Sequence, residues 1–426
     1  MKNVMAMILA GGEGRRLFPL TQERAKPAVP FGAKYRIIDF VLNNFINSEI
    51  YRIKILTQFK SDSLNKHVSR GWPMSPIYGH YIDLVPAQMR MGDSWFVGTA
   101  DAIHQNLNLI HDEQPEKVCV FGSDHIYKMD IRQMVHFHDT HNAELTIAAI
   151  PVPVDKASAF GIIRMDGDYR VIGFDEKPDK PSEIPGQPGW CLASMGNYIF
   201  EAETLVEVVA TDALDETSQH DFGRNIIIKM ITEGRRVYVY DFHTNVIPGA
   251  TDVERGYWRD VGDLDAYWEA NMDLVSITPI INIYNPQWPI RTYSYQAPPT
   301  KYVHNEAERI GFATESIVSD GCIISGGRIS RSVLSPYVRV NSYAVIEDSI
   351  IMHGVKIGRY AKLKKVIVDK NVSLPAGVEI GFDRTADEAR GFFVSPGGVT
   401  VVPKGTVIDP PAESDYLPQP QDLSLN

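Results

Sequence analysis

The sequence predicts an α/β fold with a mostly parallel sheet in the N-terminal part of the chain, followed by a parallel β-helix. Two observations lead to this prediction. From residue 4 to residue 150, apolar segments of strand length alternate with segments of helical periodicity, as in a parallel sheet covered by helices on both faces. Beyond residue 316, single apolar residues recur at steps of six, six and five, which is the spacing of a three-sided β-helix.

The first elements follow from apolar spacing. Val4–Leu9 is an apolar run of strand length that ends in glycines. Ile38–Ser48 places its apolar residues three or four positions apart, as a helix does. Arg52–Thr57 is predicted as a second strand and Ser61–Ser69 as a second helix, for which Ser61 is a candidate N-cap.

The later elements of the sheet continue the alternation. Thr99–His111 is predicted as one helix with an apolar side, and Lys117–Phe121 as a buried strand. Ile131–His141 is predicted as a helix and Glu144–Ile150 as a strand. The histidines of the former helix, such as His138, lack a cysteine partner and are expected to be solvated rather than to bind a metal.

The β-helix prediction rests on one series of apolar positions, with Gly, Ser and Asn between them for the corners. The series is Ile317, Ile323, Ile329, Leu334, Val340, Ile346, Ile351, Ile357, Leu363, Val368, Leu374 and Ile380. An ordinary antiparallel β domain is the alternative. Stacked coils leave edges that favour oligomerisation. The tail, Thr400–Asn426, is rich in Pro and acidic residues, and we expect only part of it to be ordered.

Length and composition indicate a globular protein of two domains. The chain has 426 residues, of which 44% are hydrophobic and 22% charged, and this length exceeds that of a single ordinary core. We expect a first domain at 1–275, a Pro- and Tyr-rich linker at 276–310 and a second domain at 311–426. Shortly before the linker, Asp263 is a candidate N-cap for a helix that begins near Leu264.

Charge and cysteine content exclude several functional classes. Acidic residues number 53 and basic residues 42, for a net charge of −11, which argues against a general binder of nucleic acid or of an anionic membrane. No apolar run approaches the ~18 residues of a membrane span. Cys119, Cys191 and Cys322 are widely spaced, and they indicate reduced thiols in a cytoplasmic protein.

A glycine-rich stretch follows the first strand at residues 9–17 (LAGGEGRRL). Glycines let backbone N–H groups approach phosphates, and Arg16 and Lys26 can balance phosphate charge. An ordinary Gly-rich turn is the alternative, and neither a Walker A loop nor a GxGxxG fingerprint is present. Asp124 follows the strand Lys117–Phe121, so both features are expected on one rim of the sheet. There Asp124 is either a Mg²⁺ ligand or a turn-forming residue.

Several strings in the same order resemble the sugar-nucleotide pyrophosphorylases, and most closely the bacterial ADP-glucose pyrophosphorylases (glucose-1-phosphate adenylyltransferases). The resemblance covers nearly the whole chain. The strings are Leu9–Leu17, Arg24–Val29, Arg36–Phe40, Gly98–Ala102, Asp124–Asp130, Glu176–Pro178, Ala193–Gly196, Ser218–Gly223 and Tyr257–Gly262.

The resemblance implies a Rossmann-like nucleotidyltransferase domain followed by a left-handed parallel β-helix. It implies that ATP and α-D-glucose 1-phosphate give ADP-glucose and diphosphate with Mg²⁺, supplying ADP-glucose for glycogen synthesis. It further implies a cytoplasmic homotetramer that small-molecule effectors regulate. No general base is needed, because the attacking phosphate is already an anion.

The resemblance also assigns site residues. Catalytic roles fall to Arg16, Lys26, Asp124 and Asp260, of which Asp124 and Asp260 are the metal ligands. The ATP site comprises Leu9, Ala10, Gly11, Gly12, Gly14, Arg16, Lys26 and Gln88. The glucose 1-phosphate site comprises Phe96, Gly161, Glu176, Lys177 and Ser194. His220 and Asp221 are structural or face the sugar.

Effector binding and its communication are assigned by the same resemblance to Arg24, Arg36, Gln58 and Trp95. The sequence departs from the family pattern at Glu13, Glu23, Pro30 and Phe96. A negative Glu23 would repel a phosphorylated activator. Three alternatives stay open: a pyrophosphorylase for another nucleotide such as dTTP or GTP, a non-catalytic regulatory subunit, and a dinucleotide-binding oxidoreductase.

Overall fold

The computed structural model of this chain describes residues 3–88, 95–306 and 309–412, so the end of the predicted tail, 413–426, lies outside the described residues. The chain divides into two units. The sheet unit comprises Met1–Glu13, Ile38–Trp258 and Ile283–Ile290, and the β-helix unit comprises Gly14–Ile37, Arg259–Asn282 and Arg291–Asn426. The domain boundaries expected from the sequence stay a prediction.

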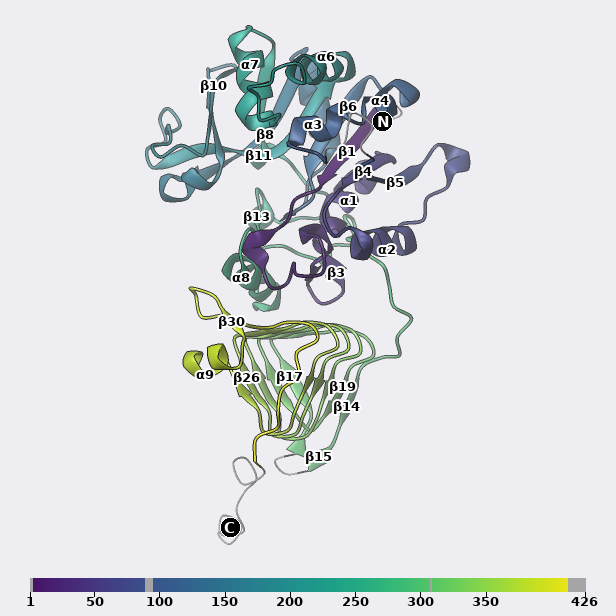
Figure 1. Cartoon of the computed structure of the whole chain (residues 1–426), viewed down its shortest axis with the longest axis vertical. Helices are drawn as coiled ribbons and strands as arrows, with labels where there is room; N and C mark the ends of the chain where they lie inside the picture. The colour runs from purple at the N-terminus through teal and green to yellow at the C-terminus, as the bar shows by residue number, and fades with distance from the viewer. Residues whose placement is uncertain (1–2, 89–94, 307–308, 413–426) are drawn as a thin grey trace. The chain divides into compact units, whose positions relative to one another are not determined.

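A nine-stranded mixed sheet forms the centre of the sheet unit (Figure 1). Its strands are β1 (Val4–Ala10), β4 (Arg52–Thr57), β5 (Tyr81–Pro86), β6 (Lys117–Gly122), β8 (Leu145–Pro153), β9 (Gly161–Met165), β10 (Val171–Glu176), β11 (Trp190–Glu201) and β12 (Val237–Asp241). The order is β10-β9-β11-β6-β1-β4-β5, with β8 on β11 and β12 on β8. Strands β1, β4, β5 and β6 run parallel. This agrees with the predicted mostly parallel sheet, although β5 was not among the predicted strands. The long strand β11 runs antiparallel to β6 and β8, which the sequence did not reveal.

Helices pack against this sheet and bury its apolar side chains. They are α1 (Ile37–Asn47), α2 (Asp62–Gly71), α3 (Thr99–His104), α4 (Leu107–Glu113), α5 (Ile131–Thr140), α6 (Ala202–Asp212) and α7 (Ile227–Thr232). The single helix predicted at Thr99–His111 is wrong, because it breaks between α3 and α4. There the buried Asn106 side chain donates to the Ala102 carbonyl at 2.8 Å, a local bond that competes with helix continuation. Ser61 precedes α2, but its side chain makes no capping hydrogen bond.

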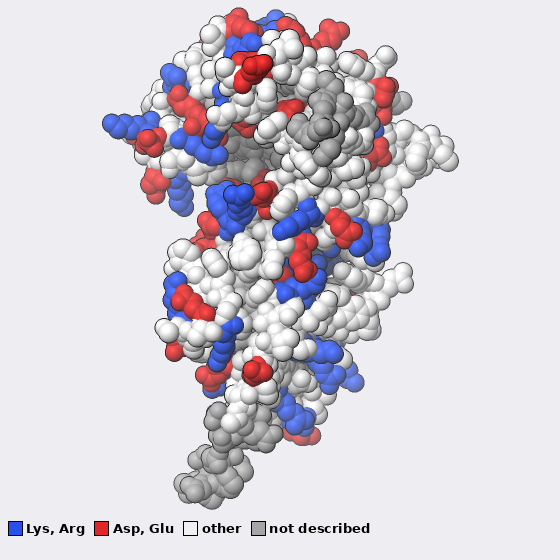
Figure 2. All heavy atoms as spheres, in the orientation of Figure 1, with Lys and Arg blue, Asp and Glu red and all other residues white. Residues whose placement is uncertain are grey.

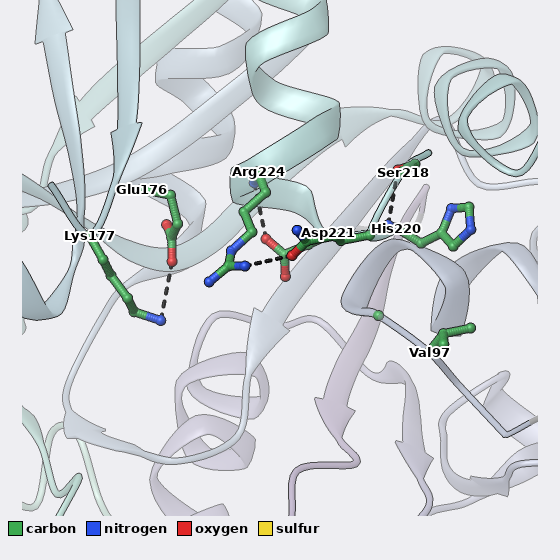
Figure 3. A pocket seen from close by; sticks show the side chains of 9 residues that line it. Val97, Glu176, Lys177, Ser218, His220, Asp221 and Arg224 are labelled. Atoms are coloured by element: carbon green, nitrogen blue, oxygen red, sulfur yellow. Dashed lines mark hydrogen bonds and ion pairs between the residues drawn. The ribbon is translucent and has the colours of Figure 1, made fainter. Parts of the chain in front are cut away.

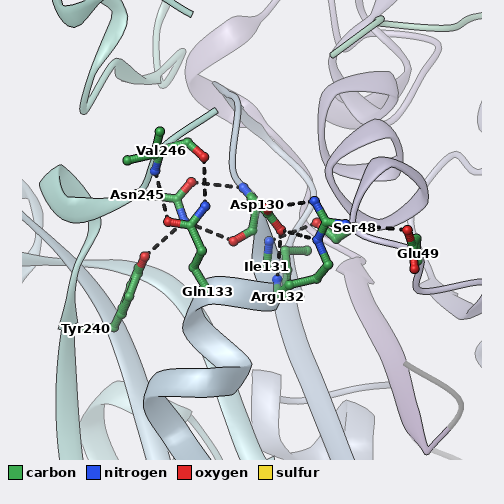
Figure 4. A network of polar contacts seen from close by, with 9 residues as sticks. All are labelled: Ser48, Glu49, Asp130, Ile131, Arg132, Gln133, Tyr240, Asn245 and Val246. Carbon is green, nitrogen blue, oxygen red and sulfur yellow. Dashed lines mark hydrogen bonds and ion pairs between the residues drawn. The ribbon is translucent and has the colours of Figure 1, made fainter. Parts of the chain in front are cut away.

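The start of α5 is fixed by a polar network (Figure 4). The Asp130 carboxylate caps the helix by accepting from the Arg132 backbone N–H at 3.1 Å and from its guanidinium at 2.8–2.9 Å. The Asn245 side chain accepts from the Asp130 N–H and donates to the Asp130 carbonyl, both at 2.9 Å. Because these bonds satisfy the buried backbone, the chain is held firmly between β6 and α5.

His138 on α5 is fully buried, which contradicts the expectation of a solvated histidine. Its ring nitrogens lie 2.8 Å from Thr146 Oγ1 and 3.1 Å from Glu201 Oε1. Strand β8 therefore supplies a partner that the sequence spacing could not show. Burial lowers the pKa of His138, although the neighbouring Glu201 carboxylate opposes this shift.

Parallel coils form the β-helix unit (Figure 1). One sheet comprises β14 (Lys301–Val303), β19 (Ile323–Ser325), β22 (Arg339–Val340), β25 (Lys356–Ile357) and β28 (Ser373–Leu374). The second comprises β17 (Phe312–Thr314), β20 (Arg328–Ser330), β23 (Val345–Glu347), β26 (Lys362–Lys364) and β29 (Glu379–Ile380). The third comprises β18 (Ile317–Val318), β21 (Val333–Leu334), β24 (Ile350–Ile351), β27 (Val366–Val368), β31 (Thr400–Val402) and β30 (Phe393–Val394). The predicted β-helix is confirmed.

The inward positions agree with the predicted series from Ile329 onward. At the first coil the prediction is wrong by one residue, because Val318 and Ile324, rather than Ile317 and Ile323, align with the inward columns. The pairing explains the slip. Ala313 aligns with Ile329, a step of 16, whereas Ile329 aligns with Ile346, a step of 17.

One corner of the β-helix carries a column of alternating charges. Its residues are Glu315, Arg331, Asp348 and Lys365, all with φ between 43° and 56°. The Arg331 guanidinium binds the Asp348 carboxylate at 2.7 and 2.9 Å. Left-handed backbone is unfavourable for such residues, so neighbouring coils must hold each corner in place.

Helix α8 (Leu264–Val275) packs on this corner within the same unit. Trp268 Nε1 donates to the Asp348 carbonyl at 2.7 Å, and the Lys365 ammonium lies 4.7 Å from the centre of the Trp268 ring. The predicted cap is confirmed, because the Asp263 carboxylate accepts from the Ala266 N–H at 2.9 Å. The unit also contains β2 (Pro30–Phe31), β3 (Tyr35–Arg36), β15 (Asn305–Glu306), β16 (Arg309–Ile310) and α9 (Arg384–Ala389).

Acidic and basic side chains are interspersed over the face drawn in Figure 2. Within the part of the chain that the structure describes, no helix has both the length and the apolar character that crossing a membrane requires.

Burial of His138 predicts acid sensitivity. Because its pKa is lower in the folded than in the unfolded state, the unfolded chain binds the extra proton first as the pH falls through about 6.5. The free energy of unfolding should therefore decrease with falling pH in that range. His138→Gln, which cannot ionise, should show a flatter profile in urea unfolding between pH 7 and 5. The exposed His136→Gln is the control, and equal slopes for the two variants would contradict the assignment.

Candidate functional site

The carboxyl ends of β1 and β6 form the rim on which the predicted site begins. The two strands are paired in parallel with Leu9 opposite Gly122. The Ser123 hydroxyl donates to the Leu9 carbonyl at 2.6 Å and fixes the two chains where they leave the sheet. The glycine stretch and Asp124 therefore emerge at the same rim, as predicted.

Gln58 connects the glycine stretch to the chain before α3. A Cβ at Gly11 would lie 3.5 Å from the Gln58 Cβ, so backbone and side chain are in contact. The Gln58 amide donates to the Phe96 carbonyl at 3.3 Å and accepts from the Phe96 N–H at 2.7 Å. Two further predicted residues, Gln88 and Trp95, are exposed. The geometry thus places Gln58 between a predicted ATP residue and a predicted sugar residue.

Asp124 stands where β6 ends and β7 (His125–Tyr127) begins. Its side chain is 37% exposed, and His125 Nε2 lies 3.5 Å from its Oδ1. The His125 ring packs against Trp258, with ring centres 5.0 Å apart. An accessible carboxylate at a strand end is suited to bind a hard cation.

A pocket of about 430 Å³ opens in the sheet unit (Figure 3). Residues from three chain segments line it, and most of them are charged or polar. They are Val97, Gly98, Glu176, Lys177, Ser218, Gln219, His220, Asp221 and Arg224. The Lys177 ammonium lies 3.2 Å from the Glu176 carboxylate. The structure thus brings together two predicted sugar-phosphate residues, Glu176 and Lys177, in a cavity with hydrogen-bonding groups of both kinds.

Two non-glycine residues of this pocket have left-handed backbone. Lys177 has a φ of 49° and His220 a φ of 52°. Each such conformation costs roughly 1–3 kcal/mol and persists where surrounding contacts impose it, often at functional sites. At His220 the contacts are visible. Asp212 accepts from Ser218 at 2.7 Å and lies 2.8 Å from His220 Nδ1.

The His220 peptide lies against the start of α3. Its carbonyl accepts from the Ala100 N–H at 2.8 Å, and a Cβ added to Gly98 would lie only 2.2 Å from that carbonyl oxygen. Thr99 Oγ1 donates to Asp221 at 3.0 Å. The close approach requires glycine at position 98 and joins two segments about 120 residues apart in sequence.

The remaining predicted sugar residues surround the pocket in different ways. A Cβ at Gly161 would lie 2.8 Å from Glu176 Oε2, so this glycine makes room for the Glu176 side chain. Phe96 directly precedes Val97 and is partly buried against the core. Ser194, on β11, accepts from the Gly196 N–H at 3.2 Å. Only Glu176 and Lys177 of the five predicted sugar residues are among the side chains that line the described pocket.

In the β-helix unit, the predicted cations gather around Asp260, at the end of β13 (Trp258–Asp260). The Lys26 ammonium lies 3.3 Å from Asp260 Oδ1. A Cβ at Gly262 would lie 3.0 Å from Asp260 Oδ2 and 3.3 Å from the Arg16 guanidinium, so both side chains adjoin this glycine. Gly14 precedes Arg16 with a φ of 65°. Lys26 and Arg16 can therefore bind the oxygens of a polyphosphate while the Asp260 carboxylate stays beside them.

Two of the residues predicted for effector binding and its communication, Arg24 and Arg36, are in the β-helix unit, whereas Gln58 and Trp95 are in the sheet unit. Arg24 is 4% exposed and binds Asp369 through both terminal nitrogens at 2.9–3.0 Å. Burial, together with the positive charges of Arg36 and Arg24, lowers the pKa of the neighbouring Lys370 to about 7. Glu23 forms an ion pair with Lys404. The geometry is a cluster of cations from the N-terminal segment and the coils.

Sequence reasoning missed five residues that line the pocket, namely Val97, Gly98, Ser218, Gln219 and Arg224. Gly98 and Gln219 stand in strings that carried the family resemblance, and Arg224 follows one of them directly. No spacing rule relates these strings, because their contact depends on the packing of α3 against α6. The one sequence signal was Gly98 itself, because a residue without a Cβ permits the close approach of the His220 carbonyl.

Comparison with known proteins gives a consistent result. Residues 5–276 match the nucleotidyl transferase family, and residues 298–402 match the GlmU-like C-terminal hexapeptide family. The chain is 55% identical to a glucose-1-phosphate adenylyltransferase of Anaeromyxobacter sp. (strain Fw109-5), over 96% of this chain and 100% of the relative. It is 54% identical to that of Thermus thermophilus, over 94% and 98% respectively. It is 49% identical to that of Deinococcus radiodurans, over 95% and 99%.

The Gly98–His220 approach predicts a specific cost for one methyl group. Gly98→Ala should lower the free energy of unfolding by about 1–3 kcal/mol, because the new Cβ overlaps a backbone oxygen that cannot move without breaking the cap of α3. Gly167→Ala is the matched control, since a Cβ there meets no atom within 4 Å. Urea unfolding measures both. Equal stability of the two variants would show that the approach is not enforced.

Proposed function

The chain belongs to the glucose-1-phosphate adenylyltransferases of the nucleotidyl transferase family, and we propose that it transfers the adenylyl group of ATP to glucose 1-phosphate and releases diphosphate. The near-complete match to enzymes of that name carries the proposal. The pocket of Glu176 and Lys177 and the cations around Asp260 support it, because the reaction joins two phosphorylated substrates. The product would serve glycogen synthesis in the cytoplasm.

The residues have distinct roles in the proposed reaction. Lys177 holds the phosphate of glucose 1-phosphate, whose oxygen attacks the α-phosphorus of ATP in line. Arg16 and Lys26 hold the β- and γ-phosphates and stabilise the negative charge of the departing diphosphate. Gly11 and Gly12 allow the nucleotide to approach the backbone. Glu176, already adjacent to Lys177, accepts hydrogen bonds from sugar hydroxyls.

We assign Mg²⁺ to Asp124 and Asp260. The donor set fits, since carboxylates and an imidazole are the candidate metal ligands among the described residues, and carboxylate oxygens suit Mg²⁺. Chain connectivity supports the pair. Trp258 packs on His125, and Asp260 follows Trp258 by two residues, a span of at most about 7 Å. Bound Mg²⁺ supplies neutralisation of phosphate charge.

Regulation and assembly complete the proposal. Arg24 and Arg36 belong to an anionic effector site, and Gln58 and Trp95 relay its state to the substrates. The direct bonds of Gln58 to the Phe96 backbone support this role. Glu23 and Pro30 set the choice of effector. The chain assembles as a homotetramer through its β-helix.

One assay separates this proposal from its alternatives. Diphosphate release from glucose 1-phosphate is measured with ATP, dTTP and GTP, using the chain expressed alone. We expect ATP to be preferred. Preference for another nucleotide would identify a different pyrophosphorylase, and inactivity with all three would indicate a regulatory subunit. Binding of a nicotinamide dinucleotide would favour an oxidoreductase.

Asp124→Asn tests the metal assignment. Loss of one anionic ligand should lower kcat by about 10²–10³ and raise the Mg²⁺ concentration needed for half-maximal rate. The exposed Asp112→Asn removes the same charge from the sheet unit at a remote position and should retain activity. Unchanged rates and Mg²⁺ dependence in Asp124→Asn would refute the assignment.

A further inference from the structure

We propose that Arg224 is a substrate-binding residue that captures the phosphate of glucose 1-phosphate together with Lys177. This inference rests on the proposed function and names a second cation for the same substrate. Four charged side chains line the pocket: Glu176, Lys177, Asp221 and Arg224. Three of them already have a charged partner or cap a turn. Arg224 differs, because its guanidinium is hydrogen-bonded to the neutral Gln219 side chain.

The charges of the other three residues are used within the pocket. Lys177 and Glu176 form an ion pair at 3.2 Å. The Asp221 carboxylate accepts from Thr99 Oγ1 at 3.0 Å and from the Arg224 backbone N–H at 3.1 Å, as the cap of the following turn. A doubly charged phosphate that entered beside Lys177 alone would therefore meet a cation whose charge Glu176 already balances.

The Arg224 guanidinium is in a different position. One terminal nitrogen donates to the Gln219 side-chain oxygen at 2.5 Å, and the guanidinium makes no ion pair with a carboxylate of the described residues. Figure 3 shows this side chain extending into the same cavity as Lys177. Gln219 orients the guanidinium without neutralising it. A planar guanidinium with several unused donors binds phosphate oxygens in pairs.

The backbone presents Arg224 to the cavity. The residue lies in a π-helical turn, Phe222–Ile226. Such turns are rare in proteins as a whole, and where they occur they are often at functional sites. Gly223 precedes it, and a Cβ there would lie 2.9 Å from Glu176 Oε2. The turn therefore passes directly beside the Glu176 side chain, and Lys177 is the next residue of that strand end. In the view of Figure 3, Glu176 lies between the Lys177 and Arg224 side chains.

Arg224 is one of the exposed residues of the pocket. Its contribution should therefore concern capture of the anionic substrate rather than the chemical step. For Arg224→Gln we expect the KM for glucose 1-phosphate to rise about tenfold, with kcat and the KM for ATP changed less than about twofold. Arg224→Lys should recover part of the affinity, since it retains the charge but not the fork.

The experiment compares these variants with Arg236→Gln, which removes an exposed arginine of the sheet unit that binds Asn142 and Glu144 away from the pocket. Steady-state kinetics are measured with glucose 1-phosphate and galactose 1-phosphate. A phosphate contact predicts an equal rise of KM for both sugars. An unchanged KM, or a change in the ratio between the two sugars, would overturn the proposal, the latter in favour of a hydroxyl contact.

Calorimetric titration of glucose 1-phosphate without ATP separates this inference from the proposed function. Suppose that Arg224→Gln binds glucose 1-phosphate more weakly than the wild-type chain does, but that the wild-type chain makes no ADP-glucose. This pair of results would uphold the phosphate contact and reject the proposed reaction. Wild-type synthesis with unaltered binding by the variant would do the reverse. If Arg224→Gln fails to fold, Gln219→Ala, which leaves the charge but removes its orienting partner, should raise the same KM about threefold, and an unchanged KM there would reject the proposal.

Discussion

The parallel pairing of β1 with β6 is the constraint on which the sheet unit's half of the site depends. Both strands are buried on both faces, so their register is set by the core and not by a turn. A shift by one residue would exchange the apolar side chains that β1 presents to its two buried faces and disrupt the packing on both. The same register places the glycines after β1 and Asp124 after β6 at one edge. The same strand register therefore determines both the packing of the core and the position of the site.

Much of this arrangement could be predicted from residues close in sequence. Strand β4 has the predicted bounds, and β1 differs from its prediction by one residue, because apolar runs and periodicity report local burial. Predictions failed where distant segments decide. His138 is buried because β8 supplies Thr146, and the first coil is one residue shorter than the pattern implies. The pocket itself depends on Gly98 meeting His220, a contact that no local spacing encodes.

The predicted site residues divide between the two units in a way that the sequence did not suggest. Arg16, Lys26 and Asp260 belong to the unit that contains the β-helix, although two of them come from the N-terminal stretch. Helix α8 accounts for the link on its side. Its N-cap, Asp263, is the third residue after Asp260. The helix binds the coils through Trp268, which donates to the Asp348 carbonyl, and through Asp265, which accepts from Ser395 and Gly397. The coils therefore support the carboxylate that adjoins the phosphate-binding cations.

The alternating corner of Glu315, Arg331, Asp348 and Lys365 restricts how this protein can change in length. Repeat proteins gain and lose coils by duplication and deletion of gene segments. An insertion of one coil here would stack two like charges in strained backbone, whereas an insertion of two would preserve the order of signs. Evolution of this corner should therefore proceed in steps of two coils, and the sign of each corner residue records the parity of its coil.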